Sequence, residues 1–202
     1  PGVWLHLAIM VPAALLAESA ILLLRGRSPF TALKDLSALL TALLLAAALP
    51  PLLPWWMAVL GVLFAIILAK QLYGGLGQNP FNPAMVGYVI LLISFPLEMT
   101  RWLPPTGLDG TTLSMGQSLQ IILGNSDLLT LDALTSATPL DTMRTQISQG
   151  HTIQEGLLQL DSGLLAGAGW EWINLAFLAG GLLLLLRGTI SWQIPLSMIL
   201  AL

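Results

Sequence analysis

The stretch LHLAIMVPAALLAESAILLL, residues 5–24, decides the fold class of this chain. It is about as long as a helix must be to cross the roughly 30 Å hydrocarbon core of a bilayer. Glu18 is its only charged residue. A signal peptide is the competing interpretation, but no basic residue precedes this run and no small-residue cleavage pattern follows it. The stretch therefore predicts a first transmembrane helix.

The rest of the chain is also strongly apolar. Hydrophobic residues make up 56% of its 202 residues and charged residues only 8%, whereas soluble domains are about 25% charged. Four further apolar runs predict membrane spans, and a fifth run resembles the start of another; these runs are 36–49, 57–69, 85–97, 164–186 and 194–202. We therefore predict an all-α polytopic membrane protein with about five to six transmembrane helices in this chain.

The polar residues divide the chain into three parts. Residues 1–97 contain transmembrane helices 1–4, with a Gly-rich re-entrant or turn segment at 74–84. Residues 98–163 hold most of the polar content, and this stretch is too long for a tight connection. Residues 164–202 contain helix 5 and the start of helix 6.

The basic residues predict how the chain is oriented. Simple alternation of the spans places five of them on one side of the membrane and two on the other. The five are Arg25, Arg27, Lys34, Lys70 and Arg187, and the two are Arg101 and Arg144. The positive-inside rule makes the five-charge side cytoplasmic. Residues 98–163 are then extracytoplasmic, on the periplasmic face if the host is a bacterium.

Several kinds of chemistry are excluded by composition. The sequence has no cysteine, so disulfides, thiolate metal sites and iron–sulfur ligation are impossible within it. It contains no phosphate-binding loop, dinucleotide fingerprint or zinc signature. Nucleic acid is not expected as a partner, because seven basic residues shared between two membrane faces form no basic stripe.

The segment DALTSATPLD, residues 132–141, is the part of the sequence that suggests a chemistry. Its D-x-x-T-x-A-T pattern resembles the acceptor site at which a flavin transferase esterifies the phosphate of FMN onto the final threonine. A carboxylate and hydroxyls would surround the incoming phosphate, and an arginine would pair with it afterwards. The candidate cofactor-binding residues are Thr138, Asp132, Thr135, Ser136, Ala137 and Arg144.

An ordinary turn is the alternative for this segment. Such a turn would cap a short helix that has Asp141 in its first turn. The segment Gly74–Pro83 has two readings of its own, either a broken helix whose amides point at a ligand or a cytoplasmic turn. Glu18 is either an intramembrane functional carboxylate or a partly hydrated interfacial one, and its place near the end of the run favours the second. His6 and His151 are expected at an interface or in a loop.

A family resemblance adds to these readings. It is carried by five blocks: KDLSALLT at 34–41, Pro50-Pro51, AKQLYGGLGQNPFNPAM at 69–85, ATPLDT at 137–142 and GLLAGAGW at 163–170. Together they resemble the NqrB/RnfD family, whose members are membrane components of the sodium-translocating NADH:quinone reductase and of the bacterial Rnf ion-translocating oxidoreductase complex. The resemblance covers nearly the whole chain.

The resemblance implies a cofactor and a fold. It implies FMN on Thr138 through a phosphoester bond, and a noncovalent riboflavin that it does not map onto residues of this chain. The family fold has about ten helices in two inverted halves, with a urea-transporter-like architecture. This chain corresponds to the first half plus part of the second, and begins inside a longer protein. The resemblance also suggests that residues are absent between Trp4 and Leu5.

The function expected from the resemblance is that of a membrane subunit in an ion-motive electron transport complex of the ferredoxin:NAD type. Its covalent FMN would relay electrons in a bacterial inner membrane, and the subunit would not be catalytic alone. Expected partners are the flavin- and Fe–S-bearing subunits of the complex, the lipid bilayer and a flavin transferase for maturation. A solute channel or transporter of urea-transporter-like architecture without a redox role is the alternative, and a scaffold for redox partners is a third possibility.

Overall fold

A computed structural model describes residues 1–75, 77–104, 113–125, 139–155 and 169–200. The regular structure in these residues is helical, and no strand occurs among them. The chain divides into two compact units. The first contains Pro1–Leu103 and Thr112–Ser136, and the second contains Pro104–Thr111 and Ala137–Leu202. The all-α prediction is confirmed, and the helices are typical of a membrane protein.

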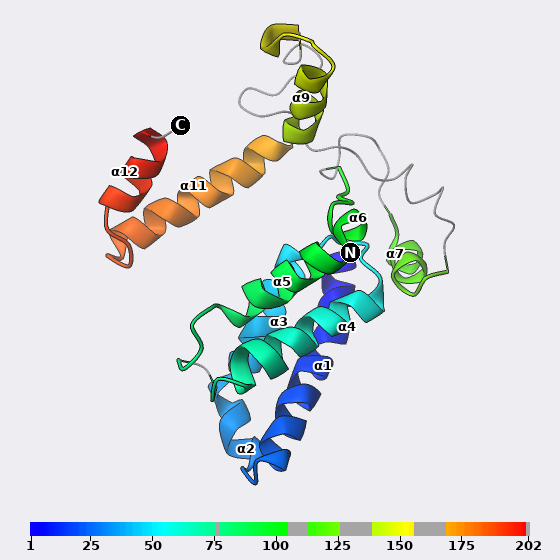
Figure 1. Cartoon of the computed structure of the whole chain (residues 1–202), viewed down its shortest axis with the longest axis vertical. Coiled ribbons are helices and arrows are strands. Elements are labelled where there is room, and N and C mark those ends of the chain that lie inside the picture. Colours follow the sequence, from blue (N-terminus) through cyan, green and yellow to red (C-terminus); the bar gives the residue numbers. More distant parts are fainter. Residues whose placement is uncertain (76, 105–112, 126–138, 156–168, 201–202) are drawn as a thin grey trace. The chain divides into compact units, whose positions relative to one another are not determined.

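The first unit is built on helix α1, Gly2–Leu24 (Figure 1). It continues through Pro12, so the proline does not end it. Its buried positions recur every three or four residues and form one stripe: Gly2, His6, Met10, Ala14, Ala17, Glu18 and Leu22. This spacing places them on a single helical face, which is the face that packs against the other helices.

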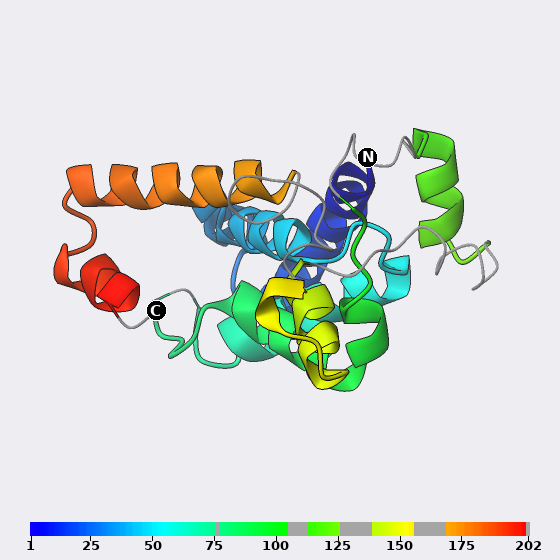
Figure 2. The ribbon, with the colours of Figure 1, turned by 90° about the horizontal axis from the view of Figure 1, so that it is seen from above.

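The helices packed around α1 follow the predicted runs closely. They are α3 (Ser37–Ala48), α4 (Trp55–Leu63), the π-helix η2 (Phe64–Gln71) that continues α4, and α5 (Pro83–Ser94). α1 packs against α3 and α4, and α5 packs against η2, α4 and α3 (Figures 1 and 2). Alanines and glycines dominate the buried face of α3 and the crossing of α4 with α5. Small residues let membrane helices approach closely, because little side chain separates their backbones.

One close approach depends on two glycines. A Cβ added at Gly87 of α5 would lie 2.5 Å from the carbonyl oxygen of Gly61 on α4. A Cβ added at Gly61 would lie 2.6 Å from a methyl carbon of Leu91. The α4–α5 crossing therefore requires glycine at position 87, where the obstacle is backbone.

Short helices make up the rest of the first unit. They are α2 (Pro29–Ala32), the 3₁₀-helix η1 (Leu33–Asp35), α6 (Pro96–Met99) and α7 (Met115–Ile122). A capping box between Ser114 and Gln117 starts α7, which also packs on α1. The second unit has α9 (Pro139–Ser148), α11 (Trp170–Leu186) and α12 (Gln193–Leu200).

Helix length separates α1 from the other apolar helices. Among the described residues α1 alone is long and apolar enough to cross a membrane unaided. The shorter apolar helices are Ser37–Ala48, Trp55–Gln71, Pro83–Ser94 and Trp170–Leu186. The predicted number of transmembrane helices, the division at residues 97 and 163, and the urea-transporter-like repeat stay predictions.

Candidate functional site

A polar cluster lies inside the helix bundle of the first unit, and Glu18 is at its centre. The Glu18 side chain is only 2% exposed, although it is the one carboxylate on a mostly apolar helix. Its Oε1 atom accepts hydrogen bonds from Lys70 Nζ at 2.5 Å and from Gln71 Nε2 at 2.7 Å. The expectation of a partly hydrated interfacial carboxylate is therefore wrong, because protein groups from another helix surround it.

The π-helix brings two consecutive side chains to the same oxygen. Lys70 and Gln71 are the last residues of η2, and both are buried. A π-helix has hydrogen bonds from i to i+5 and thus wider turns than an α-helix, so neighbouring residues are separated by a smaller angle. Such segments are rare and occur frequently at functional sites. Here the geometry gives one carboxylate oxygen two donors from adjacent positions.

Ser37 links this ion pair to the protein surface. Its Oγ atom accepts a hydrogen bond from Lys70 Nζ at 2.5 Å and donates one to Asp35 Oδ1 at 2.5 Å. The backbone N–H of Ser37 also donates to Asp35 Oδ1, at 2.8 Å. Leu36, between them, has a φ of 56°, in the left-handed region that leucine rarely occupies. This turn brings the exposed Asp35 back over the start of α3.

The environment of Asp35 favours its ionised form. Partial burial acts to raise the pKa of this carboxyl group, but the two hydrogen bonds from Ser37 and the positive charge of Lys70 act against it. The net effect holds the pKa of Asp35 below its ordinary value. Asp35 is therefore a charged acceptor at the exposed end of the cluster.

Two buried atoms at opposite ends of α1 have no hydrogen-bond partner among the described residues. One is Oε2 of Glu18, in the polar cluster. The other is Nδ1 of His6, whose Nε2 lies 2.8 Å from the carbonyl oxygen of Leu53. His6 is fully buried on α1, so the expectation of a loop position is wrong for this residue, and its position at a membrane interface stays a prediction.

A pocket of about 280 Å³ opens next to the cluster. One wall comes from the first two turns of α3 and the other from the segment before α5. The lining residues are Ser37, Leu40, Thr41, Leu44, Asn79, Pro80, Phe81, Asn82 and Pro83. We call this the α3 pocket. Since Ser37 belongs to both, its hydroxyl connects the α3 pocket to the Lys70–Glu18 pair.

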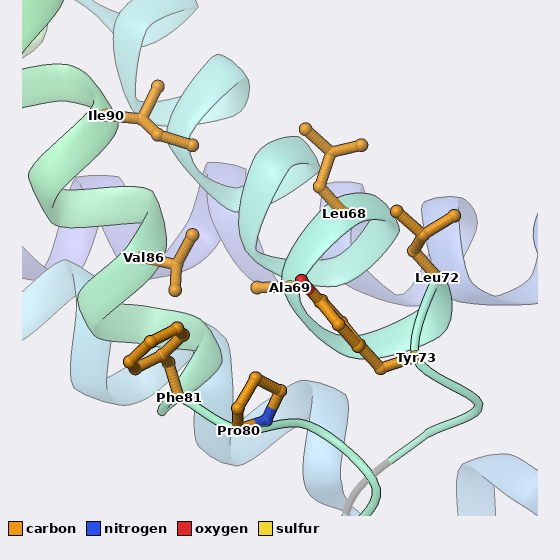
Figure 3. A pocket seen from close by; sticks show the side chains of 8 residues that line it. All are labelled: Leu68, Ala69, Leu72, Tyr73, Pro80, Phe81, Val86 and Ile90. Carbon is orange, nitrogen blue, oxygen red and sulfur yellow. The ribbon is translucent and has the colours of Figure 1, made fainter.

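The segment before α5 contains turns in the described residues. Turns occur in both interpretations of this segment, so the choice between a broken helix and a cytoplasmic turn stays a prediction. Asn82 ends the segment by accepting a hydrogen bond from the N–H of Ala84 at the start of α5. On its other side lies a second pocket, also of about 280 Å³, where side chains of η2, α5 and this segment converge (Figure 3). Pro80 and Phe81 line both pockets.

The sequence singled out few of these residues. Lys70 contributes to the predicted orientation, and Lys70, Ser37 and Gln71 belong to the blocks that carry the family resemblance, but no sequence pattern assigns them a role at a site. A signal was present: Glu18 and Lys70 are opposite charges in or beside two different apolar runs. Such isolated charges in apolar segments pair with one another when the helices pack.

Most of the predicted flavin site lies outside the described residues. This applies to Asp132, Thr135, Ser136, Ala137 and Thr138. The described part begins at Pro139, the first residue of α9, which has Asp141 in its first turn as the turn interpretation expects. Arg144 is exposed on the same helix. The FMN attachment stays a prediction.

Comparisons with a family model and with individual relatives point to the same family. The model of the NQR2, RnfD, RnfE family matches residues 2–202. The chain is 51% identical to proteins named as the D subunit of the ion-translocating oxidoreductase complex, from Shigella dysenteriae serotype 1 (strain Sd197) and Escherichia coli (strain SE11). Each alignment covers 100% of this chain and 60% of the relative.

The chain thus spans less than two thirds of the length of these relatives. The alignments have 212 positions, more than the 202 residues of the chain, so the relatives carry residues within the aligned region that this chain lacks. The predicted gap after Trp4 would be one such place, and it stays a prediction. Because the family model matches almost every residue, the chain belongs to the NQR2, RnfD, RnfE family.

Proposed function

We propose that this chain is part of a membrane subunit of an ion-motive electron transport complex. In this complex it carries covalent FMN on Thr138 and relays electrons between ferredoxin-side and NAD-side subunits, coupled to ion movement. The observation that carries the proposal is the match along the whole chain to relatives named as the D subunit of the ion-translocating oxidoreductase complex. We place the complex in a bacterial inner membrane, with Thr138 on the periplasmic side.

The residues around Thr138 support a role in holding the cofactor. FMN would supply reversible electron transfer, and the protein would fix its position and tune its potential. Arg144 is exposed on α9, six positions after Thr138, and its guanidinium suits a phosphate group. Asp132, Thr135, Ser136 and Ala137 complete the acceptor pattern.

Mass spectrometry of the peptide around Thr138 tests the attachment. In the full-length protein made with its flavin transferase, we expect a mass increment equal to esterified FMN on Thr138. Thr138→Ala removes the increment and the flavin fluorescence that survives denaturing electrophoresis. The matched control is Thr145→Ala on α9, whose hydroxyl donates to the carbonyl of Asp141, and it retains the flavin. Persistent covalent flavin in Thr138→Ala contradicts the assignment.

We also infer that the α3 pocket takes a noncovalent flavin. Leu40, Leu44 and Phe81 give it apolar walls that suit a ring system. Two hydroxyls and two amides lie along the same walls and can bond ring heteroatoms; they belong to Ser37, Thr41, Asn79 and Asn82. A mostly apolar cavity with a few convergent polar groups is the usual form of a ligand site.

Filling the α3 pocket tests this second flavin. Leu44→Trp places a larger ring where the ligand would lie, and we expect extractable flavin to be lost while covalent flavin stays. Leu43→Trp is the matched control, because Leu43 is exposed on the same helix and does not line the pocket. Equal extractable flavin in both variants contradicts the inference. A flavin-free preparation from the native host that conducts solute in liposomes would instead support the channel alternative.

A further inference from the structure

A continuous chain of hydrogen bonds joins the surface of the first unit to the carboxylate buried in its core. It begins at Asp35, which is exposed, and passes through the Ser37 hydroxyl and the Lys70 ammonium group to Glu18. Each of its three links has a donor–acceptor distance of 2.5 Å. This hydrogen-bond chain therefore contains no gap that a water molecule would have to fill.

Lys70 is the donor at both of its links in this hydrogen-bond chain, to Glu18 Oε1 and to Ser37 Oγ. Between Lys70 and the surface, the hydrogens point toward Asp35, because Ser37 in turn donates to Asp35. A serine hydroxyl has one hydrogen to give and lone pairs to accept another, so it can pass a proton on while receiving one. The arrangement is thus set for proton movement from Lys70 toward Asp35, and the reverse orientation follows once the hydroxyl has transferred its hydrogen.

Both ends of the hydrogen-bond chain, Asp35 and Glu18, are suited to exchange a proton. Asp35 contacts solvent, on the side that the basic residues predict to be cytoplasmic. At the other end, Glu18 Oε2 is buried and has no hydrogen-bond partner in the part of the chain that the structure describes, which leaves it able to receive a proton. Gln71 is uncharged and bonds only Oε1. His6 also lies on α1, but it is about 18 Å from Glu18 at 1.5 Å per residue, so it does not belong to the hydrogen-bond chain.

We propose that Asp35, Ser37 and Lys70 form a proton path between water at one membrane face and the buried Glu18. When Glu18 gains a proton, its pair with Lys70 carries a net positive charge, and this favours release. The Lys70 N–H bond breaks as its proton moves to Ser37 Oγ, and the Ser37 O–H bond breaks as its hydrogen moves to Asp35. Asp35 passes the proton to water. The Glu18 carboxyl group turns its protonated oxygen toward the neutral Lys70 amine, the Glu18 O–H bond breaks, and the proton forms a new N–H bond on Lys70 Nζ. One proton leaves Glu18 and one reaches water, so the series of transfers is balanced. The same transfers in reverse order deliver a proton from water to Glu18.

This path goes beyond the proposed electron relay and does not require it. No flavin takes part in the transfer, and no electron moves. Failure of the flavin assignment would therefore leave the path intact, and failure of the path would leave the flavin assignment intact.

Infrared spectroscopy of the full-length protein in lipid nanodiscs tests the path. The protonated carboxyl band of Glu18 is identified by its loss in Glu18→Gln, and its appearance and decay are followed after pH jumps. In Asp35→Asn we expect both rates to fall about tenfold or more, a change equivalent to about 1.4 kcal/mol in barrier height. The asparagine side chain still accepts the hydrogen bonds from Ser37, so the turn at Leu36 is kept. Its amide group, unlike the carboxylate, cannot take up and release a proton.

A second variant and a control separate the path from a general effect. Ser37→Ala removes the middle link and is expected to slow the same rates, with a thermal melt to confirm that the bundle is folded. Ser19→Ala is the control and keeps the wild-type rates, because the Ser19 hydroxyl donates to the carbonyl of Leu15 and lies outside the path. Wild-type rates in Asp35→Asn, or a Glu18 that never protonates over the pH range in which the protein is folded, would overturn the proposal.

Discussion

At the scale of single residues, the Lys70–Glu18 pair is a buried ion pair whose two members depend on each other. Both side chains are almost fully buried, with exposed fractions of 1% and 2%. Taking two charges out of water is costly, and their attraction offsets the cost only when both partners are present with good geometry. The pair is therefore sensitive to the loss of either member.

Removing one charge of this pair tests that sensitivity. We expect Lys70→Met to lower the free energy of unfolding by about 3–5 kcal/mol, because it leaves the Glu18 charge buried and unpaired. Adding Glu18→Gln to the same protein restores most of the loss, since no uncompensated charge is left. Detergent-solubilised protein can be compared by chemical unfolding. A double variant as unstable as Lys70→Met would contradict this account.

Asp35 gives the protein a pH dependence with a defined sign. Its folded-state pKa is depressed, so its contribution to stability is present above the ordinary carboxyl pKa of 3.8 and is lost as pH falls through the lower folded value. Asp35→Asn is expected to flatten the stability profile in that acidic window. Near neutral pH the variant is less stable than the wild type by the lost contribution, but the slope of stability against pH is unchanged. Thermal melts over a pH series measure this. An unchanged acid limb in the variant would rule the carboxylate out as its cause.

Glu18 also shows a limit of prediction at this scale. The sequence places it seven residues before Arg25, near the end of an apolar run, and this position favours an interfacial carboxylate. Its actual surroundings are set by Ser37, Lys70 and Gln71, which belong to other elements. Periodicity along one helix gives a face but does not say which polar groups meet that face.

At the scale of elements, the π-helix was not predictable from composition. Its sequence, FAIILAKQ at residues 64–71, suits an α-helix equally well, and the run 57–69 was expected to be a single ordinary span. η2 packs against α1, α4 and α5, and the sequence alone does not distinguish its wider turns from those of an α-helix. The element that positions Lys70 and Gln71 is therefore visible only in three dimensions.

The close crossing of α4 and α5 leads to a separate prediction about stability. Gly87→Ala is expected to destabilise the bundle by about 1–3 kcal/mol, because the added methyl group meets the rigid carbonyl of Gly61 rather than a movable side chain. Gly180→Ala in α11 is the matched control, since nothing lies within 4 Å of a Cβ built there. Thermal melting of the two variants checks the difference, and an equal shift in both would show that the crossing tolerates a methyl group.

At the scale of the whole molecule, the sequence predicted the class and the main helices well. The runs 36–49 and 85–97 correspond to α3 at Ser37–Ala48 and α5 at Pro83–Ser94, because prolines and polar residues mark their ends. The α3 pocket and the polar cluster were missed. They arise where three segments distant in sequence come together, and no local pattern records that meeting.

The predicted orientation can be tested with single introduced thiols in a cysteine-free background, to which these 202 residues contribute no cysteine. Gln149→Cys lies in the polar region expected outside, and Ser28→Cys lies beside the basic residues expected inside. In intact spheroplasts, a membrane-impermeant maleimide should label the first variant, and it should label the second only after permeabilisation. The reverse pattern would invert the orientation and place Thr138 on the cytoplasmic face.

The ion pair also constrains how the protein is made. Glu18 and Lys70 are separated by 52 positions, so a nascent chain exposes the carboxylate to the insertion machinery well before its cationic partner is synthesised. Until η2 packs beside α1, each charge sits in an apolar segment with nothing to neutralise it, and an intramembrane charge is costly. α1 is thus not stable in the membrane until η2 packs against it and Lys70 pairs with Glu18. The two segments that hold the ion pair, α1 and η2, therefore become stable together rather than one after the other.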